Sequence, residues 1–135
     1  MGQSGVILLD TPVVLWLACE PSRVSNRASQ AIEDARKNEG GLAISGITLL
    51  EIATLARKGR IHLGSTLESF LQEVEVGFLV LPISGLACAR SVELPTAYPD
   101  DPADRIIGAT ALVQGIPLLT ADEKIRQSRA VQTIW

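Results

Sequence analysis

Short apolar runs alternate with longer segments of helical character along nearly the whole chain. These runs are continuous rather than alternating, which is typical of strands that are buried on both faces of a sheet. The expected strands cover residues 5–9, 42–45, 78–81 and 117–120, and residues 130–135 are a fifth candidate.

Capping residues mark the start of the helices that separate these runs. Thr11 and Pro12 fit the N-cap and the first position of a helix after the first strand. Thr48 and Glu51 have the spacing of a capping box, and residues 65–68 repeat it. Further helices are expected after Ser25, over residues 86–92, from Asp101 to Gly115, and from Asp122.

This alternation predicts a single α/β domain over residues 1–135. The short connections favour a mainly parallel, twisted sheet of four to five strands with helices on both faces, a three-layer α/β/α arrangement. The chain has 135 residues and 47% apolar content, enough to bury one sizeable core. A charged content of 20% argues against disorder.

Composition sets the expected compartment and excludes some partners. Cys19 and Cys88 stand alone, outside any CxxC pattern, as expected for a reducing compartment. The apolar run at residues 6–9 is too short for a signal segment or a membrane span, so we expect a cytoplasmic protein. A net charge of −3 does not by itself indicate a nucleic-acid partner.

Four carboxylates from distant parts of the chain are expected at one edge of the sheet. Asp10 follows the first strand and Asp122 follows the fourth, while Glu51 and Asp104 lie in first turns of helices entered from that edge. Ligand sites in such folds lie outside the carboxyl ends of the strands. The sequence therefore predicts a shared acidic cleft.

Each acid also has a purely structural explanation. Asp10 and Asp122 could cap turns or helices, Glu51 could complete a capping box, and Asp104 could compensate a helix dipole. Four carboxylates in one cleft would nevertheless repel one another unless a cation held them. Ligation by oxygen alone selects Mg²⁺ or Mn²⁺ over zinc.

Other chemistries lack the residues that they require. His62 is the only histidine, which leaves little for a zinc site or a histidine-dependent triad, and no nucleotide-binding glycine loop is present. Phosphoryl transfer to Asp10, as in phosphatase-like or receiver-like domains, remains an alternative. Against it, no second acid stands two residues on, and Lys124 comes after Asp122. A catalytically inactive binding module is the other alternative.

Taken together, these segments resemble the PIN-domain ribonucleases, in particular the toxins of VapBC-type toxin–antitoxin pairs. The matching segments occur in the family's order along the chain. They are residues 8–11, Leu15-Trp16, Ser45, and residues 51–53, 58–61, 101–107, 109–111 and 118–122. The Asp-Pro-Ala-Asp-Arg-Ile-Ile block at 101–107 is the most specific segment. Pro12 departs from the pattern, because these toxins often carry histidine there.

The resemblance implies a PIN-like fold and a Mg²⁺- or Mn²⁺-dependent endoribonuclease that blocks translation as the toxin of such a pair. It places the acidic site residues at Asp10, Glu51, Asp104 and Asp122. Asp101 is either an outer metal ligand or only a helix cap, and Asp100 has no assigned role. The resemblance also implies a homodimer and inhibition by a cognate antitoxin that inserts an arginine-bearing segment.

Further residues are expected to support such a site. Thr11, Ser45 and Thr120 could hydrogen-bond the carboxylates or the attacking water. Because an acidic cleft repels RNA, affinity must come from the metal and from nearby basic residues. The candidates are Arg57, Lys58, Arg60, Arg105 and Lys124, each of which could equally be an ordinary solvated charge.

Overall fold

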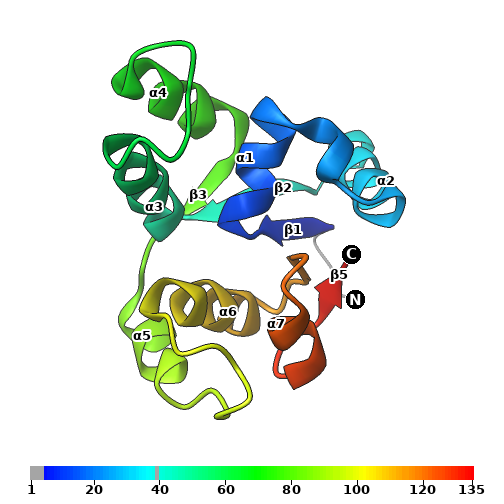
Figure 1. Ribbon diagram of the computed structural model, residues 1–135. Coiled ribbons are helices and arrows are strands. Elements are labelled where there is room, and N and C mark those ends of the chain that lie inside the picture. The colour runs from blue at the N-terminus through cyan, green and yellow to red at the C-terminus, as the bar shows by residue number, and fades with distance from the viewer. Residues whose placement is uncertain (1–4, 39) are drawn as a thin grey trace.

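The computed structural model describes residues 5–38 and 40–135, and its centre is a five-stranded, all-parallel sheet (Figure 1). The strands lie in the order β3-β2-β1-β4-β5. Their bounds are β1 (Val6–Leu9), β2 (Gly41–Ser45), β3 (Leu79–Leu81), β4 (Leu118–Leu119) and β5 (Thr133–Ile134). The predicted parallel sheet is confirmed, including the candidate last strand.

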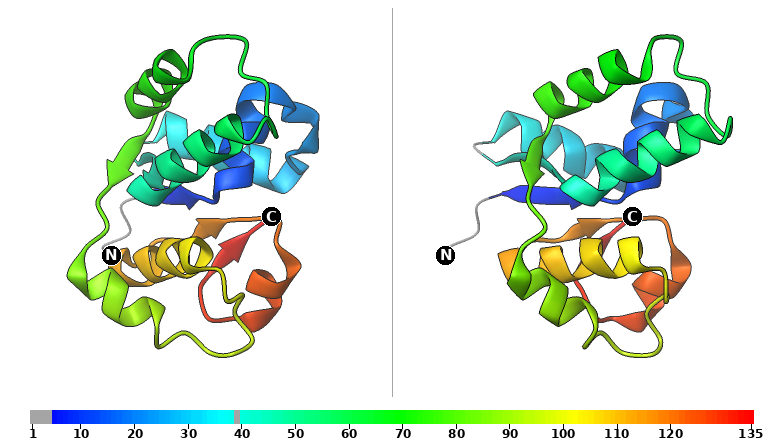
Figure 2. Two further views of the ribbon diagram at one scale, coloured as in Figure 1. Left: turned by 60° about the vertical axis from the view of Figure 1, so that its left-hand side comes forward. Right: turned by 90° about the vertical axis from the view of Figure 1, so that its left-hand side faces the viewer.

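Helices cover both faces of this sheet (Figures 1 and 2). One face carries α1 (Thr11–Cys19), α2 (Asn26–Lys37), α3 (Gly46–Arg57) and α4 (Leu67–Gly77), with a short 3-10 turn, Pro21–Arg23, after α1. The other face carries α5 (Gly85–Ser91), α6 (Pro102–Gln114) and α7 (Glu123–Ser128). No helix in the described part of the chain is long and apolar enough to cross a membrane.

Two hydrophobic cores lie on opposite sides of the sheet, and the strand β1 contributes to both. Ile7 and Leu9 belong to the core under α1–α4, whereas Leu8 belongs to the core under α6 and α7. Successive side chains of a strand point to opposite faces, so a continuous apolar run is what such a strand requires.

Three predicted helix caps are wrong by one to three residues. Asp10 rather than Thr11 caps α1. Ser45 caps α3, which therefore begins at Gly46, directly after the strand, and Thr48 lies inside the first turn. Thr66 rather than Ser65 caps α4. By contrast, Ser25, Asp101 and Asp122 are the caps that the sequence predicts.

The loop between α5 and α6 packs against α6 through a glycine. Tyr98 is buried, and its hydroxyl donates a hydrogen bond of 3.1 Å to the backbone oxygen of Asp104. A Cβ atom on Gly108 would overlap the phenol ring of Tyr98. This close approach fixes the loop along the first two turns of α6.

The strand order also fixes where a site can form. After β3 the chain crosses to the far side of β1, so the direction of winding changes between β1 and β4. In open α/β sheets, ligands bind outside the carboxyl ends of the strands at such a switch point. The residues that follow β1 and β4 are Asp10 and Thr120.

Candidate active site

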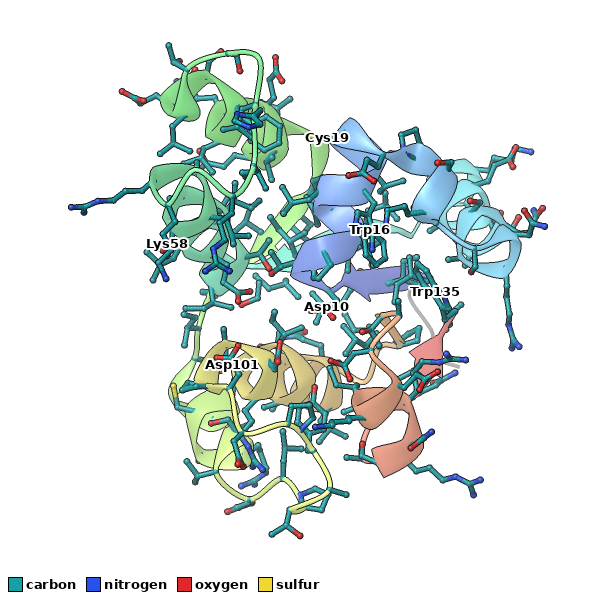
Figure 3. All side chains as sticks on the ribbon, viewed as in Figure 1. Asp10, Trp16, Cys19, Lys58, Asp101 and Trp135 are labelled. Atoms are coloured by element: carbon teal, nitrogen blue, oxygen red, sulfur yellow. The ribbon has the colours of Figure 1, made fainter. Side chains whose placement is uncertain are left out.

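Asp10 lies at this switch point and is only 4% exposed (Figure 3). Its Oδ1 accepts a hydrogen bond of 3.0 Å from the backbone N–H of Thr11, and its Oδ2 accepts one of 2.7 Å from the Thr120 hydroxyl. Burial raises the pKa of Asp10, these two hydrogen bonds oppose that rise, and the charges of Asp122 and Asp101 add to it. The carboxylate is therefore rigidly held.

Glu51 is held by a chain of two threonines. The Thr11 hydroxyl donates to Glu51 Oε1 and lies 2.9 Å from the Thr48 hydroxyl, so Thr48 must donate to Thr11. Thr48 is fully buried. The capping-box interpretation of Thr48 and Glu51 is thus wrong, because both side chains turn towards α1. Burial raises the pKa of Glu51, and the bond from Thr11 lowers it.

Asp104 is the third carboxyl of the site with a raised pKa. It lies in the first turn of α6, half-buried. Burial, followed by the charges of Asp10, Asp101, Glu51 and Asp122, raises its pKa to about 7. The acids from β1, α3, α6 and the end of β4 therefore act on one another electrostatically, as the shared cleft requires.

The remaining predicted acids and hydroxyls are helix caps as well as neighbours of the site. Asp122 Oδ1 accepts from the Ile125 N–H at 3.0 Å, and its own N–H donates to the Thr120 hydroxyl at 3.1 Å. Exposed Asp101 caps α6 by accepting from the Ala103 N–H at 3.3 Å. Ser45 is buried and caps α3.

Two cavities open onto these acids. A groove of about 560 Å³ runs between α1 and α3 and includes Thr11, Glu51 and Asp104 in its lining. A smaller cavity of about 340 Å³ is lined by Asp10, Asp104 and Asp122 with Ala121. Pro12, Trp16 and Asp104 line both, so the two cavities adjoin at the first turns of α1 and α6.

Trp16 lines both cavities, and the sequence does not predict this role. Its ring centroid lies 5.7 Å from that of Trp135, so the last residue of the chain packs beside α1 (Figure 3). The Arg23 guanidinium lies 4.3 Å from the Trp16 ring centroid. Leu15-Trp16 carries part of the family resemblance, but no local pattern predicts its contact with a residue at the other end of the chain.

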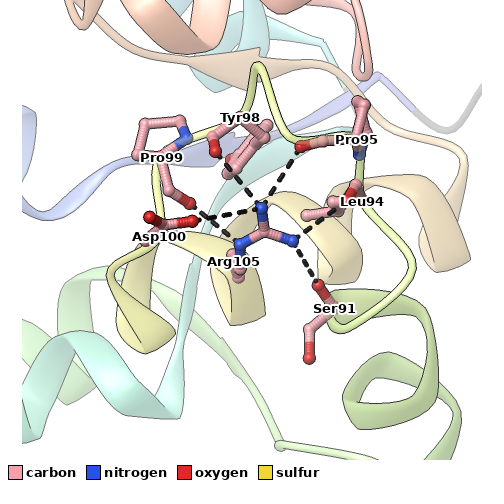
Figure 4. Close-up of polar contacts among 7 residues, drawn as sticks. All are labelled: Ser91, Leu94, Pro95, Tyr98, Pro99, Asp100 and Arg105. Atoms are coloured by element: carbon pink, nitrogen blue, oxygen red, sulfur yellow. Dashed lines mark hydrogen bonds and ion pairs between the residues drawn. The ribbon is translucent and has the colours of Figure 1, made fainter.

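The sequence predicts that Arg105 contacts RNA, but in the structure it contacts the protein's own backbone (Figure 4). Its guanidinium donates five hydrogen bonds of 3.0–3.2 Å to the carbonyl oxygens of Ser91, Leu94, Pro95, Tyr98 and Pro99. It also lies 3.7 Å from the Asp100 carboxylate, and its side chain is 16% exposed. A guanidinium has five N–H groups, so none remains for a phosphate. Arg105 instead binds the loop before α6.

The donors at the site suit a hard divalent cation that keeps part of its water. They are carboxylates and hydroxyls, and repulsion between the carboxylates adds to the effect of burial in raising the pKa of Asp104. Among the described residues, no three or more His, Cys, Asp and Glu side chains form a ready-made metal cluster. Mg²⁺ is commonly held by one or two carboxylates, water and substrate phosphate, so this arrangement fits it.

The protein without added cation should be less stable at neutral than at mildly acidic pH. The pKa of Asp104 is near 7 when folded and 3.8 ordinarily, so the folded state retains a proton that the unfolded state loses. The free energy of unfolding should fall as pH rises from about 4 to about 7, by roughly 1–2 kcal/mol after allowance for solvent screening.

Urea denaturation at pH 5 and pH 7.5 would measure this difference. Asp104→Asn should remove much of the pH dependence, and Mg²⁺ should restore stability at pH 7.5 beyond NaCl of equal ionic strength. An unchanged pH dependence in Asp104→Asn, or equal effects of Mg²⁺ and NaCl, would contradict the shared acidic site.

Known proteins resemble this chain over nearly its full length. The family model described as PIN domain matches residues 7–130. The chain is 40% identical over 131 residues to Ribonuclease VapC22 of Mycobacterium tuberculosis, covering 96% of this chain and 98% of that protein. Its fold is similar to VapBC2 from Rickettsia felis bound to a promoter DNA fragment, with a TM-score of 0.73, 18% identity, and 95% and 96% of the two chains covered. A toxin–antitoxin complex from Klebsiella pneumoniae is similar with a TM-score of 0.63 and 25% identity, covering 93% of this chain and 94% of that chain.

Proposed function

Because this chain belongs to the PIN-domain family, we propose that it is a divalent-cation-dependent endoribonuclease and the toxin of a toxin–antitoxin pair. The observation that carries the proposal is the cavity lined by Asp10, Asp104 and Asp122 at the switch point of the sheet. Its 40% identical relative is named a ribonuclease, which supports RNA as the substrate.

Asp10, Asp104 and Asp122 would hold the cation, with Glu51 beside them and Asp101 outside. When bound, Mg²⁺ or Mn²⁺ supplies a water of lowered pKa and neutralises charge on the phosphoryl oxygens. The Thr120 hydroxyl and the Thr11 N–H fix both oxygens of Asp10. Thr11 fixes Glu51 at the wall of the groove, where its carboxylate would be placed to accept a proton from the attacking water. Ser45 supports the site by capping α3.

A phosphoryl-aspartate mechanism fits Asp10 poorly. An attacking carboxylate oxygen must approach a bulky phosphoryl group to bonding distance, which 4% exposure of Asp10 hinders more than contact with a small cation. Position 12, where a phosphatase-type site places its second acid, is Pro12. Hydrolysis by water, with no protein nucleophile, is the better match to this geometry.

The proposed partners follow from the same site and from the relatives. An arginine-bearing antitoxin segment would complement the acidic end of the groove, and the Klebsiella pneumoniae relative is described as a toxin–antitoxin complex. We propose a homodimer as well, which is supported by the exposed apolar side chains of Leu79, Ile83 and Leu86 at the edge of the sheet and on α5. The proposed compartment is the cytoplasm.

Cleavage of total cellular RNA by the purified protein tests the function. We expect cleavage with Mg²⁺ or Mn²⁺, none with EDTA, and none with Asp104→Asn. Asp100→Asn is the matched control, because Asp100 is fully exposed and has only a long ion pair with Arg105. Cleavage that survives EDTA, or equal activity of the two variants, would refute the proposal.

A further inference from the structure

The large groove changes in character along its length. One end is acidic and contains Glu51 and Asp104 beside Thr11. The floor is apolar and is formed by Leu15, Trp16, Leu55 and Ile61. The remaining lining includes the cationic side chains of Arg23 and Arg60, the carboxylate of Glu20, and His62. From Thr11 to Cys19 the helix α1 spans about 12 Å, so these features lie within a few nucleotides of the acids.

Arg23 has contacts that position its side chain but leave part of its guanidinium accessible to solvent. Its guanidinium lies over the Trp16 ring, at 4.3 Å from the centroid, and 3.9 Å from a Glu20 carboxylate oxygen. Its side chain is still 55% exposed. Trp135 packs against Trp16 at an interplanar angle of 56° and supports it. We call Arg23, Trp16 and Trp135 the Arg23 stack.

We propose that the Arg23 stack binds a base of the RNA strand that lies in this groove, a few nucleotides from the scissile phosphate. The inference rests on the proposed ribonuclease function, because the acidic end is where the scissile phosphate must lie. Unpaired bases stack on aromatic rings and arginine planes, whereas in a duplex their faces are covered by neighbouring bases.

The charges favour RNA over a protein segment at this part of the groove. The two arginines Arg23 and Arg60 outnumber the one carboxylate, Glu20, in this part of the lining, so its net charge attracts a phosphate and repels the basic side chains that suit the acidic end. Of the sequence-predicted RNA contacts, Arg60 alone lines the groove, while Arg57, Lys58 and Lys124 line neither cavity. Lys58 lies well apart from Asp10 (Figure 3).

Tryptophan fluorescence provides a signal that is specific to this site. The chain has two tryptophans, Trp16 and Trp135, and both belong to the Arg23 stack. The probe is a short, dye-labelled, single-stranded RNA of random sequence, compared with the same RNA annealed to its complement. Asp104→Asn protein keeps the probe intact, and binding is followed by tryptophan quenching and by dye anisotropy.

We expect the single strand to quench the tryptophans and to bind about tenfold more tightly than the duplex. In the same background, Arg23→Gln should weaken binding about 5- to 10-fold and lower the slope of log K against log salt by about one. Arg27→Gln on α2 is the matched control, because Arg27 is exposed and lines neither cavity, and it should bind like its parent.

Three results would overturn the inference. They are equal effects of the two arginine variants, binding without tryptophan quenching, and quenching by an arginine-rich peptide but not by RNA. If any of these occurs while wild-type protein still cleaves RNA, only the groove assignment fails. If the wild type does not cleave RNA, the proposed function itself fails.

Discussion

Asp10→Asn is expected to lower RNA cleavage roughly a thousandfold or more while leaving the fold intact. The variant removes the negative charge at the innermost position of the proposed cation site. Its amide oxygen can still accept from the Thr11 N–H, as Asp10 Oδ1 does now at 3.0 Å. Its amide nitrogen can donate to the Thr120 hydroxyl, which replaces the present 2.7 Å bond in the opposite direction.

Initial rates on one defined RNA, measured at saturating Mg²⁺, would give the size of this loss. Asp34→Asn is a matched control, because Asp34 is exposed on the outer face of α2, and it should cleave RNA like the wild type. Circular dichroism and thermal unfolding must show that Asp10→Asn is folded. A folded Asp10→Asn protein with more than a tenth of wild-type activity would contradict the role of Asp10.

Arg105→Gln is expected to lower the free energy of unfolding by about 3 kcal/mol. Four of the five carbonyl oxygens that Arg105 binds belong to the loop at residues 92–99, which contains no helix or strand, and the fifth belongs to Ser91 at the end of α5. Glutamine cannot reach or satisfy five acceptors, so the loop would lose its main attachment to α6.

Urea denaturation would measure this loss. Arg126→Gln is the control, because Arg126 is exposed on α7, and it should change the free energy of unfolding by less than about 0.5 kcal/mol. The short RNA binding assay should be run on both variants under conditions in which they are folded. A stable Arg105→Gln protein with weakened RNA binding would reinstate Arg105 as a phosphate contact.

The grouping of the acids can be predicted from the sequence because each acid is attached to an element that its own neighbours define. Asp10 ends a continuous apolar run, and Asp104 stands two residues after a proline that starts a helix. Once the strands are parallel, their carboxyl ends share one edge, so local signals are sufficient to bring these acids together.

The errors occur where two local interpretations compete and tertiary contacts decide between them. Thr48 and Glu51 have capping-box spacing, but Ser45 already caps α3, and the Thr11 hydroxyl on α1 is the partner that they meet. Arg105 stands beside a proposed ligand and therefore resembles a phosphate contact. Only the folded loop reveals five backbone acceptors around it. The contact of Trp16 with Trp135 has no local signal at all.

The proposed function requires that a divalent cation bound by the acids around Asp10 is needed for RNA cleavage. The most direct test is a Mn²⁺ titration in which bound Mn²⁺ is counted by electron paramagnetic resonance while RNA cleavage is measured in the same samples. We predict that bound Mn²⁺ and cleavage rise together in the wild type and that both are lost in Asp10→Asn. Cleavage without bound Mn²⁺, or equal Mn²⁺ binding by the two proteins, would contradict the claim.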